Sequence, residues 1–295
     1  GDSDAQFGLG QCYAQGDGVV KDPEKAVMWH RKAALQGHVE AQFNLAGLLF
    51  IGSGNSETRE AEAKKWAQLA AKQGHAEAQF LLGLLWDPLL DLGEGKGKDP
   101  NKALKWYRSA AELGLAKAQF EMGRCYLGDR GLEANDAEAV SWFRKAAEQG
   151  NSDGQQALAF SYMRGSGVEK DYGEAVTWLR KLATKNRFFA MYHIGQLYSE
   201  GGNGLVKDLT KAAKWFLEGA EWGYSPAQVR LSFCYRHGDG VLRDYVRAYK
   251  WANLAAVSGD EDAKKSREEL ELKMTAEQIS EGQQLSRDWK SRSTR

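Results

Sequence analysis

Histidine and cysteine are the residues of this chain best suited to metal binding or nucleophilic catalysis, and they are few and scattered. The five histidines are His30, His38, His75, His193 and His237. None belongs to the close histidine or cysteine cluster that a zinc site requires. No serine or cysteine lies in a nucleophile motif such as GxSxG. We therefore expect no catalytic residue, no metal and no cofactor, although a triad assembled from distant positions would leave no such motif.

The three cysteines occupy one repeated position, two residues after the small central residue of an LGxxY-like motif. They are Cys12, Cys125 and Cys234. Helices that pack about 8–10 Å apart would hold cysteines three repeats distant well beyond the roughly 7 Å Cα limit of a disulfide. Leucine or serine takes this position in the other copies. We predict three free thiols that are small, buried and unreactive.

Glycine-rich loops are a second place where chemistry is possible. A GxGV pattern occurs at residues 16–19, 165–168 and 238–241. The GxxxxGK[ST] arrangement of a phosphate site is absent, and an aspartate follows each loop at the place where an anion would sit. These loops therefore predict turns. The segment 93–98 carries two lysines that could touch an anion, but a flexible inserted tip is the simpler interpretation.

Charge and hydropathy limit the partners. The chain has 40 lysines and arginines and 40 aspartates and glutamates, so no overall field attracts nucleic acid or an anionic membrane. No apolar run approaches the about 18 residues of a membrane-spanning helix. We expect no nucleic-acid partner and no membrane insertion by this segment. The chain opens with Gly1, and we expect its true start to lie upstream.

The elements that must position any site follow from seven regularly spaced tryptophans. These are Trp29, Trp66, Trp106, Trp142, Trp178, Trp215 and Trp251, separated by 36 to 40 residues. Such a period is typical of stacked supersecondary units. Alanine stands three residues before and five after every tryptophan, a helical pattern that predicts a bulky ring packed between small residues.

Caps and turns divide each unit into two helices. An aspartate or asparagine precedes the tryptophan helix in six copies, with Thr58 or Ser56 as the alternative in the remaining one. Glycine, or Asn186 in one copy, follows eight residues after the tryptophan and predicts the helix end. The preceding LGxxY-like segment predicts another helix. The sequence thus predicts an all-α solenoid of antiparallel helical hairpins.

We place seven repeats in residues 1–262 and a terminal cap in residues 263–295. The approximate repeat bounds are 1–40, 41–77, 78–117, 118–153, 154–189, 190–226 and 227–262. Thr275 and Gln278 predict a capping box. Ile279, Leu285 and Trp289 would give the terminal helix one apolar face that covers the open end of the array. A basic tail follows from residue 290, which we expect to fray.

The string AQFGLGQCYAQGDGVVKDPEKAVMWHRKAALQG resembles the Sel1-like repeat, a relative of the tetratricopeptide repeat, and the likeness returns along nearly the whole chain. In the tetratricopeptide signature a tryptophan precedes LGxxY by three residues. Glutamine holds that place here, at Gln6, Gln42, Gln79, Gln119 and Gln228. The resemblance implies a right-handed superhelix that serves as an adaptor or scaffold. It also implies frequent export in bacteria, so we favour the periplasm or cell envelope over the cytoplasm.

A variable stripe on the first helices is the best candidate for partner binding, because buried repeat positions keep their residue type and this stripe does not. On the inner curve of a solenoid it would form an apolar trough. The predicted concave-face residues are Phe50, Leu84, Arg124, Leu127, Phe160, Met163, Gln196, Phe233 and Arg236. In the inserted loop of the third repeat, spanning residues 86–98, they are Trp86, Leu89, Leu90 and Leu92. The opposing interpretation assigns the phenylalanines before the motif, such as Phe7 and Phe43, to the core.

These features predict a non-catalytic adaptor, monomeric alone, whose groove binds another protein or peptide. A narrower hypothesis is an immunity or inhibitor protein that blocks a bacterial toxin or effector enzyme, with the inserted loop reaching into its target. A hydrolase acting on cell-wall or peptide-like substrates is the alternative from another class. That hydrolase would need a cleft with two titratable groups within hydrogen-bond reach.

Overall fold

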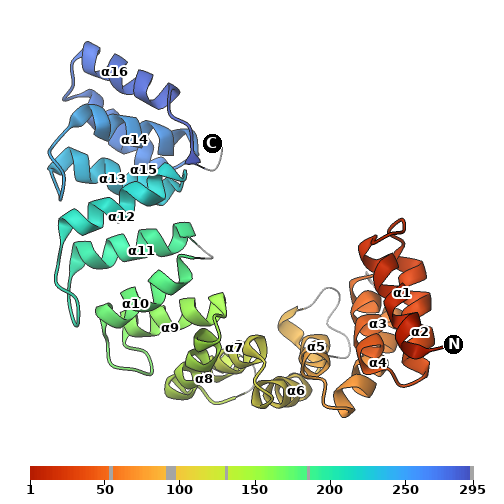
Figure 1. Cartoon of the computed structure of the whole chain (residues 1–295). Helices are drawn as coiled ribbons and strands as arrows, with labels where there is room; N and C mark the ends of the chain where they lie inside the picture. Colours follow the sequence, from red (N-terminus) through yellow and green to blue (C-terminus); the bar gives the residue numbers. More distant parts are fainter. Residues whose placement is uncertain (53–55, 91–97, 130–131, 185–186, 293–295) are drawn as a thin grey trace. The chain divides into compact units, whose positions relative to one another are not determined.

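The computed structural model describes residues 1–52, 56–90, 98–129, 132–184 and 187–292. Contacts between Cα atoms divide the chain into two compact units, Gly1–Asn151 and Ser152–Arg295. We call them unit 1 and unit 2 and describe each by itself. Figure 1 labels the helices of both units.

Both units consist of helices that run back and forth in pairs (Figure 1). Unit 1 contains α1 (Ser3–Gln15), α2 (Pro23–Leu35), α3 (Val39–Ile51), α4 (Glu57–Lys72), α5 (Ala76–Trp86), a 3-10 turn η1 (Pro88–Leu90), α6 (Pro100–Glu112), α7 (Ala116–Arg124), a π-helical turn η2 (Cys125–Asp129) and α8 (Asp136–Glu148). Unit 2 contains α9 (Ser152–Arg164), α10 (Tyr172–Leu182), α11 (Arg187–Glu200), α12 (Leu209–Glu221), α13 (Ser225–His237), α14 (Tyr245–Val257), α15 (Glu261–Glu271) and α16 (Ala276–Arg287).

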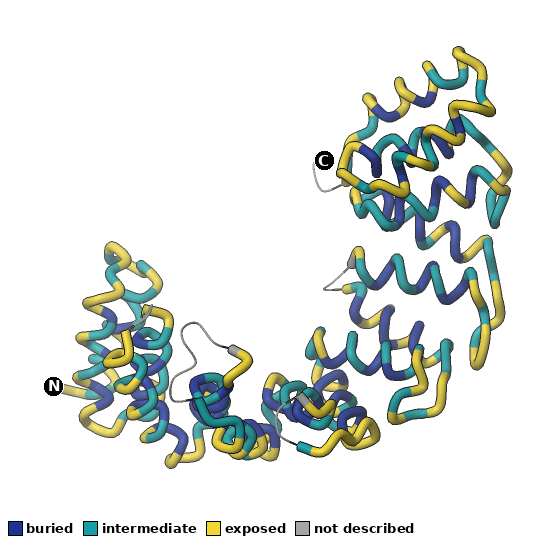
Figure 2. Tube along the Cα trace, turned by 180° about the vertical axis from the view of Figure 1, so that it is seen from behind, coloured by how far each residue is buried: buried dark blue, intermediate teal, exposed yellow. Residues whose placement is uncertain are grey.

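The expected all-α solenoid architecture is confirmed. Within the described residues the only extended pairing is an isolated bridge between Gly202 and Leu205. No helix in that part of the chain is long and apolar enough to cross a membrane. Buried residues lie where helices of a unit face one another, and exposed residues gather at the loops (Figure 2).

The second helix of each hairpin begins at the predicted cap. Asp22 accepts a hydrogen bond on Oδ1 from the Lys25 backbone N–H at 3.0 Å, and this bond is the main reason that the pKa of Asp22 is lowered. Side chains cap the other second helices in the same way, at Asp99, Asn135, Asp171, Asp208 and Asp244. For α4 the cap is Ser56. Each cap satisfies a backbone donor that the helix itself leaves unpaired.

Glycines end these helices as predicted. A positive φ, which only glycine adopts without strain, occurs at Gly37, Gly74, Gly114, Gly150, Gly223 and Gly259. Asn186, the predicted equivalent in the fifth repeat, lies outside the described residues.

The two helices of a hairpin approach closely at the small central residue of the LGxxY-like motif. Four of these residues are glycines, and each packs against a ring from the residue that follows the repeated tryptophan. The pairs are Gly10 with His30, Gly83 with Tyr107, Gly123 with Phe143 and Gly195 with Phe216. A methyl group on Gly195 would lie only 2.6 Å from Cε1 of Phe216. The glycine therefore provides the space that the ring fills.

The three remaining repeats have neither the central glycine nor the ring after the tryptophan. Their first helices have a side chain at the central position, in Ala46, Ala159 and Ser232. Their second helices lack a ring after the tryptophan and have Ala67, Leu179 and Ala252 instead. All six residues are buried. The fifth repeat combines Ala159 with the larger Leu179, whereas the second and seventh repeats combine two small residues, Ala46 with Ala67 and Ser232 with Ala252.

The repeated tryptophans are less uniformly buried than we expected. Trp66, Trp178 and Trp251 are buried, but the other four indoles are only half-buried. Lysines cover the outer faces of several rings, as in Trp142, where the Lys145 Nζ lies 3.9 Å from the ring centroid. The uniform wedge predicted from the spacing is therefore wrong. The side chain that fills the hairpin interior is the one after the tryptophan.

Buried glutamines join consecutive hairpins. Gln42 Nε2 donates to the Ala34 carbonyl at 3.2 Å. Equivalent bonds of 3.3 Å run from Gln79 to Ala71, from Gln119 to Ala111 and from Gln228 to Ala220. Each bond links the first helix of one repeat to one of the last carbonyls of the preceding second helix. Each of these carbonyls also accepts from the backbone N–H of the glycine that ends the helix, as Ala34 does from Gly37 at 3.0 Å. The glutamine is therefore a second donor, and it crosses the repeat boundary.

The terminal helix α16 covers α14, but not through the apolar face predicted for it. The capping box of Thr275 and Gln278 is confirmed. The buried residues of α16 are Gly282 and Ser286, and Gly282 lies directly against the ring of Tyr249. Leu285 is 37% exposed. A ring on α14 again requires a small residue on its partner, so the small residues of α16 face inward and Leu285 does not.

The segment after α16 returns to helices earlier in unit 2. Trp289 lies beyond the helix, with its ring centroid 6.0 Å from that of Trp251. Ser291 Oγ donates to the Trp222 carbonyl at 2.9 Å, and Arg292 pairs with Glu221. The expectation that the tail frays from residue 290 is therefore wrong for its first residues.

The cysteines are free, as predicted. Cys125 and Cys234 are buried and Cys12 is half-buried. Burial raises the pKa of the Cys234 thiol to about 11. The reactive thiolate form is therefore disfavoured at neutral pH.

The fit between glycine and ring predicts a specific pattern of stability. Gly123→Ala should lower the free energy of unfolding by about 1–3 kcal/mol, because the new methyl group would overlap the Phe143 ring. Combining it with Phe143→Leu copies the pair Ala159 and Leu179. This double variant should be more stable than the sum of the two single changes implies. Urea unfolding of all variants measures this coupling.

Gly8→Ala is the matched control, because Gly8 lies in α1 with open space around it. That change should raise the free energy of unfolding by about 0.5–1 kcal/mol. Equal effects of the two glycine substitutions, or strict additivity in the double variant, would contradict the proposed packing.

Burial of His30 predicts a dependence of stability on pH. His30 is 1% exposed, and desolvation, with a smaller contribution from His38, lowers its pKa from 6.5 to about 4. The unfolded chain therefore binds this proton first as the pH falls. The free energy of unfolding should be full above about pH 6.5 and should decrease toward pH 4. His30→Phe, which copies Phe143 and Phe216, should flatten this part of the profile in thermal melts. An unchanged slope in the variant would show that other groups cause it.

Candidate functional site

The predicted first-helix residues of unit 1 do not form a continuous open surface. Phe50 and Leu84 are half-buried and pack against the core of this unit. Leu127 is 46% exposed, at the end of the first helix of the fourth repeat. Arg124 pairs with Glu121 at 3.2 Å on the same helix, so its charge is compensated. Of these four predicted residues, only Leu127 presents a largely open apolar side chain.

The inserted loop of the third repeat is shorter than the sequence suggested. Trp86 is the last residue of α5. Lys64 and Lys102 pack against its ring, and the Nζ atom of each lies 4.3 Å from the ring centroid. Asp87 is fully buried, and its Oδ2 accepts from the Tyr107 hydroxyl at 2.9 Å. Trp86 was therefore wrongly placed in the loop.

The other end of the insertion is also held by the fold. Lys98 Nζ donates to the Leu85 carbonyl at 3.1 Å. Leu89 lies in η1, near the start of the insertion, and its side chain is 53% exposed. The backbone of Leu90 ends η1, whereas Leu92 lies outside the described residues. Binding by Leu89, Leu90 and Leu92 stays a prediction.

Unit 2 contains a continuous group of aromatic side chains on its first helices. Phe160 of α9 contacts Phe189 and His193 of α11, with ring centroids 5.6 and 5.3 Å apart. Phe189 and His193 are one helical turn apart, and their centroids are 4.3 Å apart. Tyr192 adjoins His193 at 5.2 Å. The rings of two successive first helices thus form one surface.

The same surface continues onto α13. Tyr192 lies 5.9 Å from Tyr224, the residue before α13, and 6.2 Å from the buried Phe216 of α12. The Arg230 guanidinium lies 5.5 Å from the Phe216 centroid and 5.8 Å from that of Phe233. We call this surface the aromatic face, consisting of Phe160, Phe189, Tyr192, His193, Tyr224, Arg230 and Phe233.

Three further predicted residues border the aromatic face. Met163 is half-buried near the end of α9. Gln196 Nε2 donates to the Tyr192 hydroxyl at 3.1 Å and so fixes the position of that ring. Arg236 forms an ion pair of 2.6 Å with Glu269 of α15. Of the nine predicted concave-face residues, unit 2 therefore holds five, of which Phe160 and Phe233 belong to the face itself.

Sequence reasoning missed Phe189, His193 and Arg230. Phe189 stands six residues before the central Gly195, and Arg230 stands two before Ser232. The variable stripe comprises the positions three before, one after and four after the small central residue of the LGxxY-like motif. It therefore does not include Phe189, His193 or Arg230. A weak signal was present, since Phe189, Tyr192, His193 and Gln196 recur at spacings of three and four residues.

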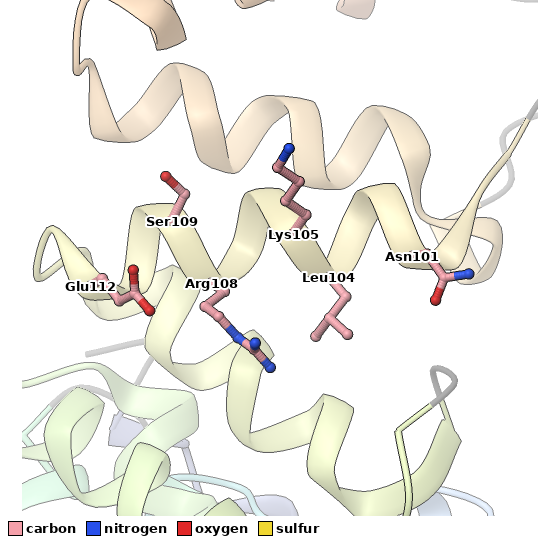
Figure 3. A pocket seen from close by; sticks show the side chains of 6 residues that line it. All are labelled: Asn101, Leu104, Lys105, Arg108, Ser109 and Glu112. Carbon is pink, nitrogen blue, oxygen red and sulfur yellow. The ribbon is translucent and has the colours of Figure 1, made fainter.

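Unit 1 has a groove of about 360 Å³ beside α6, the second helix of the third repeat. Figure 3 shows that its labelled side chains all come from this one helix, with Leu104 and Arg108 on one side and Lys105 on the other. The lining is Asn101, Leu104, Lys105, Arg108, Ser109 and Glu112. Among these six lining residues only Glu112 has a carboxylate, and none is histidine or cysteine. This groove offers no pair of groups suited to acid and base catalysis.

Among the described residues, no three histidine, cysteine or acidic side chains come together in a way that could hold a metal ion.

The most exposed ring of the aromatic face is Phe233, at 46%. This geometry favours contact with a partner's apolar side chains.

A family model described as Sel1 repeat matches the chain seven times. The matched residues are 3–38, 39–75, 76–115, 116–151, 152–186, 189–224 and 225–260. This chain belongs to the Sel1 repeat family. Sel1 repeats generally mediate interactions between proteins, and proteins built from them are generally non-catalytic scaffolds.

Similar proteins include solved Sel1 repeat structures. A Sel1 repeat protein from Oxalobacter formigenes is 32% identical, with a TM-score of 0.67 over 91% of this chain and 76% of that one. A protective antigen of uropathogenic Escherichia coli with an SLR fold is 27% identical, with a TM-score of 0.53 over 97% and 84% of the two chains.

A curated relative matches a smaller part of the Sel1 array. The alginate biosynthesis protein AlgK of Azotobacter vinelandii is 31% identical over 103 residues, which is 35% of this chain. The match spans 22% of the length of that relative.

Proposed function

We propose that this chain is a non-catalytic adaptor that holds a segment of another protein on the aromatic face of unit 2. The observation that carries the proposal is the series of contacts from Phe160 on α9 to Phe233 on α13, in which the buried Phe216 and the Arg230 guanidinium link Tyr192 to Phe233. Aromatic side chains placed together on one surface supply large contact areas at a low cost in conformational entropy. Family membership supports the general role.

Neighbouring side chains hold the residues of the aromatic face in place, which favours a preformed site. Gln196 fixes the Tyr192 hydroxyl, and Phe216 lies beneath both Tyr192 and Arg230. A preformed surface loses less conformational freedom when a partner binds. A bound peptide or helix would lie across the first helices of unit 2, over the aromatic face.

An inhibitor of a toxin or effector enzyme is a narrower form of this proposal. Leu89, 53% exposed at the start of the third-repeat insertion, is the observation that favours it. An exposed apolar residue next to an insertion is suited to enter a partner's pocket.

Substitutions on the aromatic face should separate binding from folding. Phe233→Ser should reduce capture of the native partner about tenfold or more, as expected for an aromatic contact worth more than about 1 kcal/mol. Its melting temperature should change less than that of Phe160→Ser, because the Phe233 side chain is already 46% exposed. Phe160→Ser should also weaken capture, but with some loss of stability, since Phe160 packs against Phe189 and His193. Affinity capture with quantitative mass spectrometry, beside thermal melts, measures both effects.

Leu242→Ser is the matched control, because Leu242 is equally apolar, 90% exposed and located in the loop before α14. It should leave capture unchanged. Equal loss of the partner in the Leu242 variant, or full capture by the Phe233 variant, would contradict the proposed site.

The inhibitor form makes its own prediction. Leu89→Ser together with removal of residues 91–97 should abolish inhibition of an effector encoded beside this chain, while Phe233→Ser measures any contribution of the aromatic face. An enzyme assay of that effector provides the readout. Intact inhibition by the shortened chain would show that the insertion does not enter the target.

A further inference from the structure

The first helices that carry the aromatic face have few acidic residues. Helix α13 contains no acidic residue, and the acidic residues of α9 and α11 are Asp153 and Glu200, near opposite ends of their helices. Arginines stand at both ends of the face. Arg164 lies over Phe160 at 5.5 Å, and Arg230 lies over Phe233 at 5.8 Å. The surface therefore combines aromatic rings with positive charge.

Among the described residues, Arg230 lacks the acidic partner that Arg124 and Arg236 of the first helices have. Arg236 is paired with Glu269, and Arg124 with Glu121. Within the described part of the chain, Arg230 has no ion pair, and its buried Nε has no hydrogen-bond partner. Its guanidinium is instead held between the Phe216 and Phe233 rings.

This arrangement leaves an unmet electrostatic requirement. A guanidinium stacked on aromatic rings keeps its planar set of N–H donors available at its edge. Partial burial removes some of the water that would otherwise satisfy these donors, so a carboxylate is the group that would complete them best. Stacking also limits the motion of the side chain, which lowers the entropy lost when the carboxylate binds.

His193 adds a second polar group in the centre of the face. Its Nδ1 is buried and has no hydrogen-bond partner among the described residues. Burial lowers the pKa of His193, so the imidazole is neutral at pH 7 and adds no charge. The neutral ring contacts Phe160 and Phe189 and so extends the aromatic face.

We propose that the segment bound by the aromatic face is acidic, with a carboxylate that Arg230 binds and neighbouring aromatic or aliphatic side chains that lie against Phe160, Phe189 and Phe233. This inference rests on the proposed function of the face and adds the chemical class of the partner. Nucleic acid fits less well, because the chain has no net charge and a phosphate backbone requires several uncompensated cations in a row.

Two synthetic peptides test the inference. In one, glutamates alternate with phenylalanine and leucine, and in the other lysine replaces every glutamate. Fluorescence anisotropy should show that the acidic peptide binds the full chain at least about tenfold more tightly than the lysine peptide. Added salt should weaken binding of the acidic peptide. Arg230→Gln should weaken it about tenfold, and Arg230→Lys should restore part of the loss.

Arg108→Gln is the matched control, because Arg108 is an exposed arginine on α6 of unit 1. It should leave peptide binding unchanged, and thermal melts verify that both glutamine variants fold. Equal affinity for the two peptides, no binding of either, or an Arg230→Gln variant that binds as the wild type does would overturn the inference.

The proposed function is judged separately. If the two peptides bind with equal affinity and Phe233→Ser weakens both, the face binds peptides without selecting acidic ones, and only the inference fails. If Phe233→Ser leaves capture of the native partner intact, the adaptor site itself is wrong. Tight binding of a single-stranded oligonucleotide in the same assay, lost in Arg230→Gln, would reassign the face to nucleic acid.

Discussion

The close approach of two helices at a small residue is the constraint on which this structure depends. Four hairpins have glycine at the centre of the first helix against the ring that follows the tryptophan, and the other three have neither the glycine nor the ring. Gly83 with Tyr107 and Ala159 with Leu179 are two solutions of the same packing problem. Because protein interiors tolerate neither voids nor overlap, a change at one position restricts the other. The repeat is therefore better described by pairs of residues than by single ones.

This constraint also explains where the aromatic face can form. Positions between the helices are committed to internal packing, and the glutamines at the repeat boundaries are committed to carbonyl groups of the preceding hairpin. The outward positions of the first helices have neither duty. Residues there can vary without loss of the fold, and in unit 2 they include Phe160, Phe189 and Phe233. Family membership fixes the scaffold, and these positions carry the binding role that we propose.

Much of the fold could be predicted from the sequence because its signals are local. Asp22 and its equivalents begin helices, Gly37 and its equivalents end them, and both depend on backbone geometry within a few residues. The filling of the interior could not be predicted in this way. Whether Trp142 or Phe143 is buried depends on the rotation of one helix against another, and the alanine spacing favoured the wrong ring. Phe160 and Phe233 were identified because variation marks an outward position. Arg230 was missed because its importance lies in the rings around it and in the missing ion pair, which are properties of three helices together.

The segment after α16 gives unit 2 an unusual closing contact. Linear repeat arrays hold their last element only by its nearest neighbour, so they tend to melt from the ends inward. Here Ser291 and Arg292 bind the end of α12, and Trp289 lies beside Trp251 of α14. The segment after α16 thus contacts both α14 and α12, which belongs to the preceding hairpin. Opening of this end has to release three layers of helices together, so the final hairpins behave as one cooperative block.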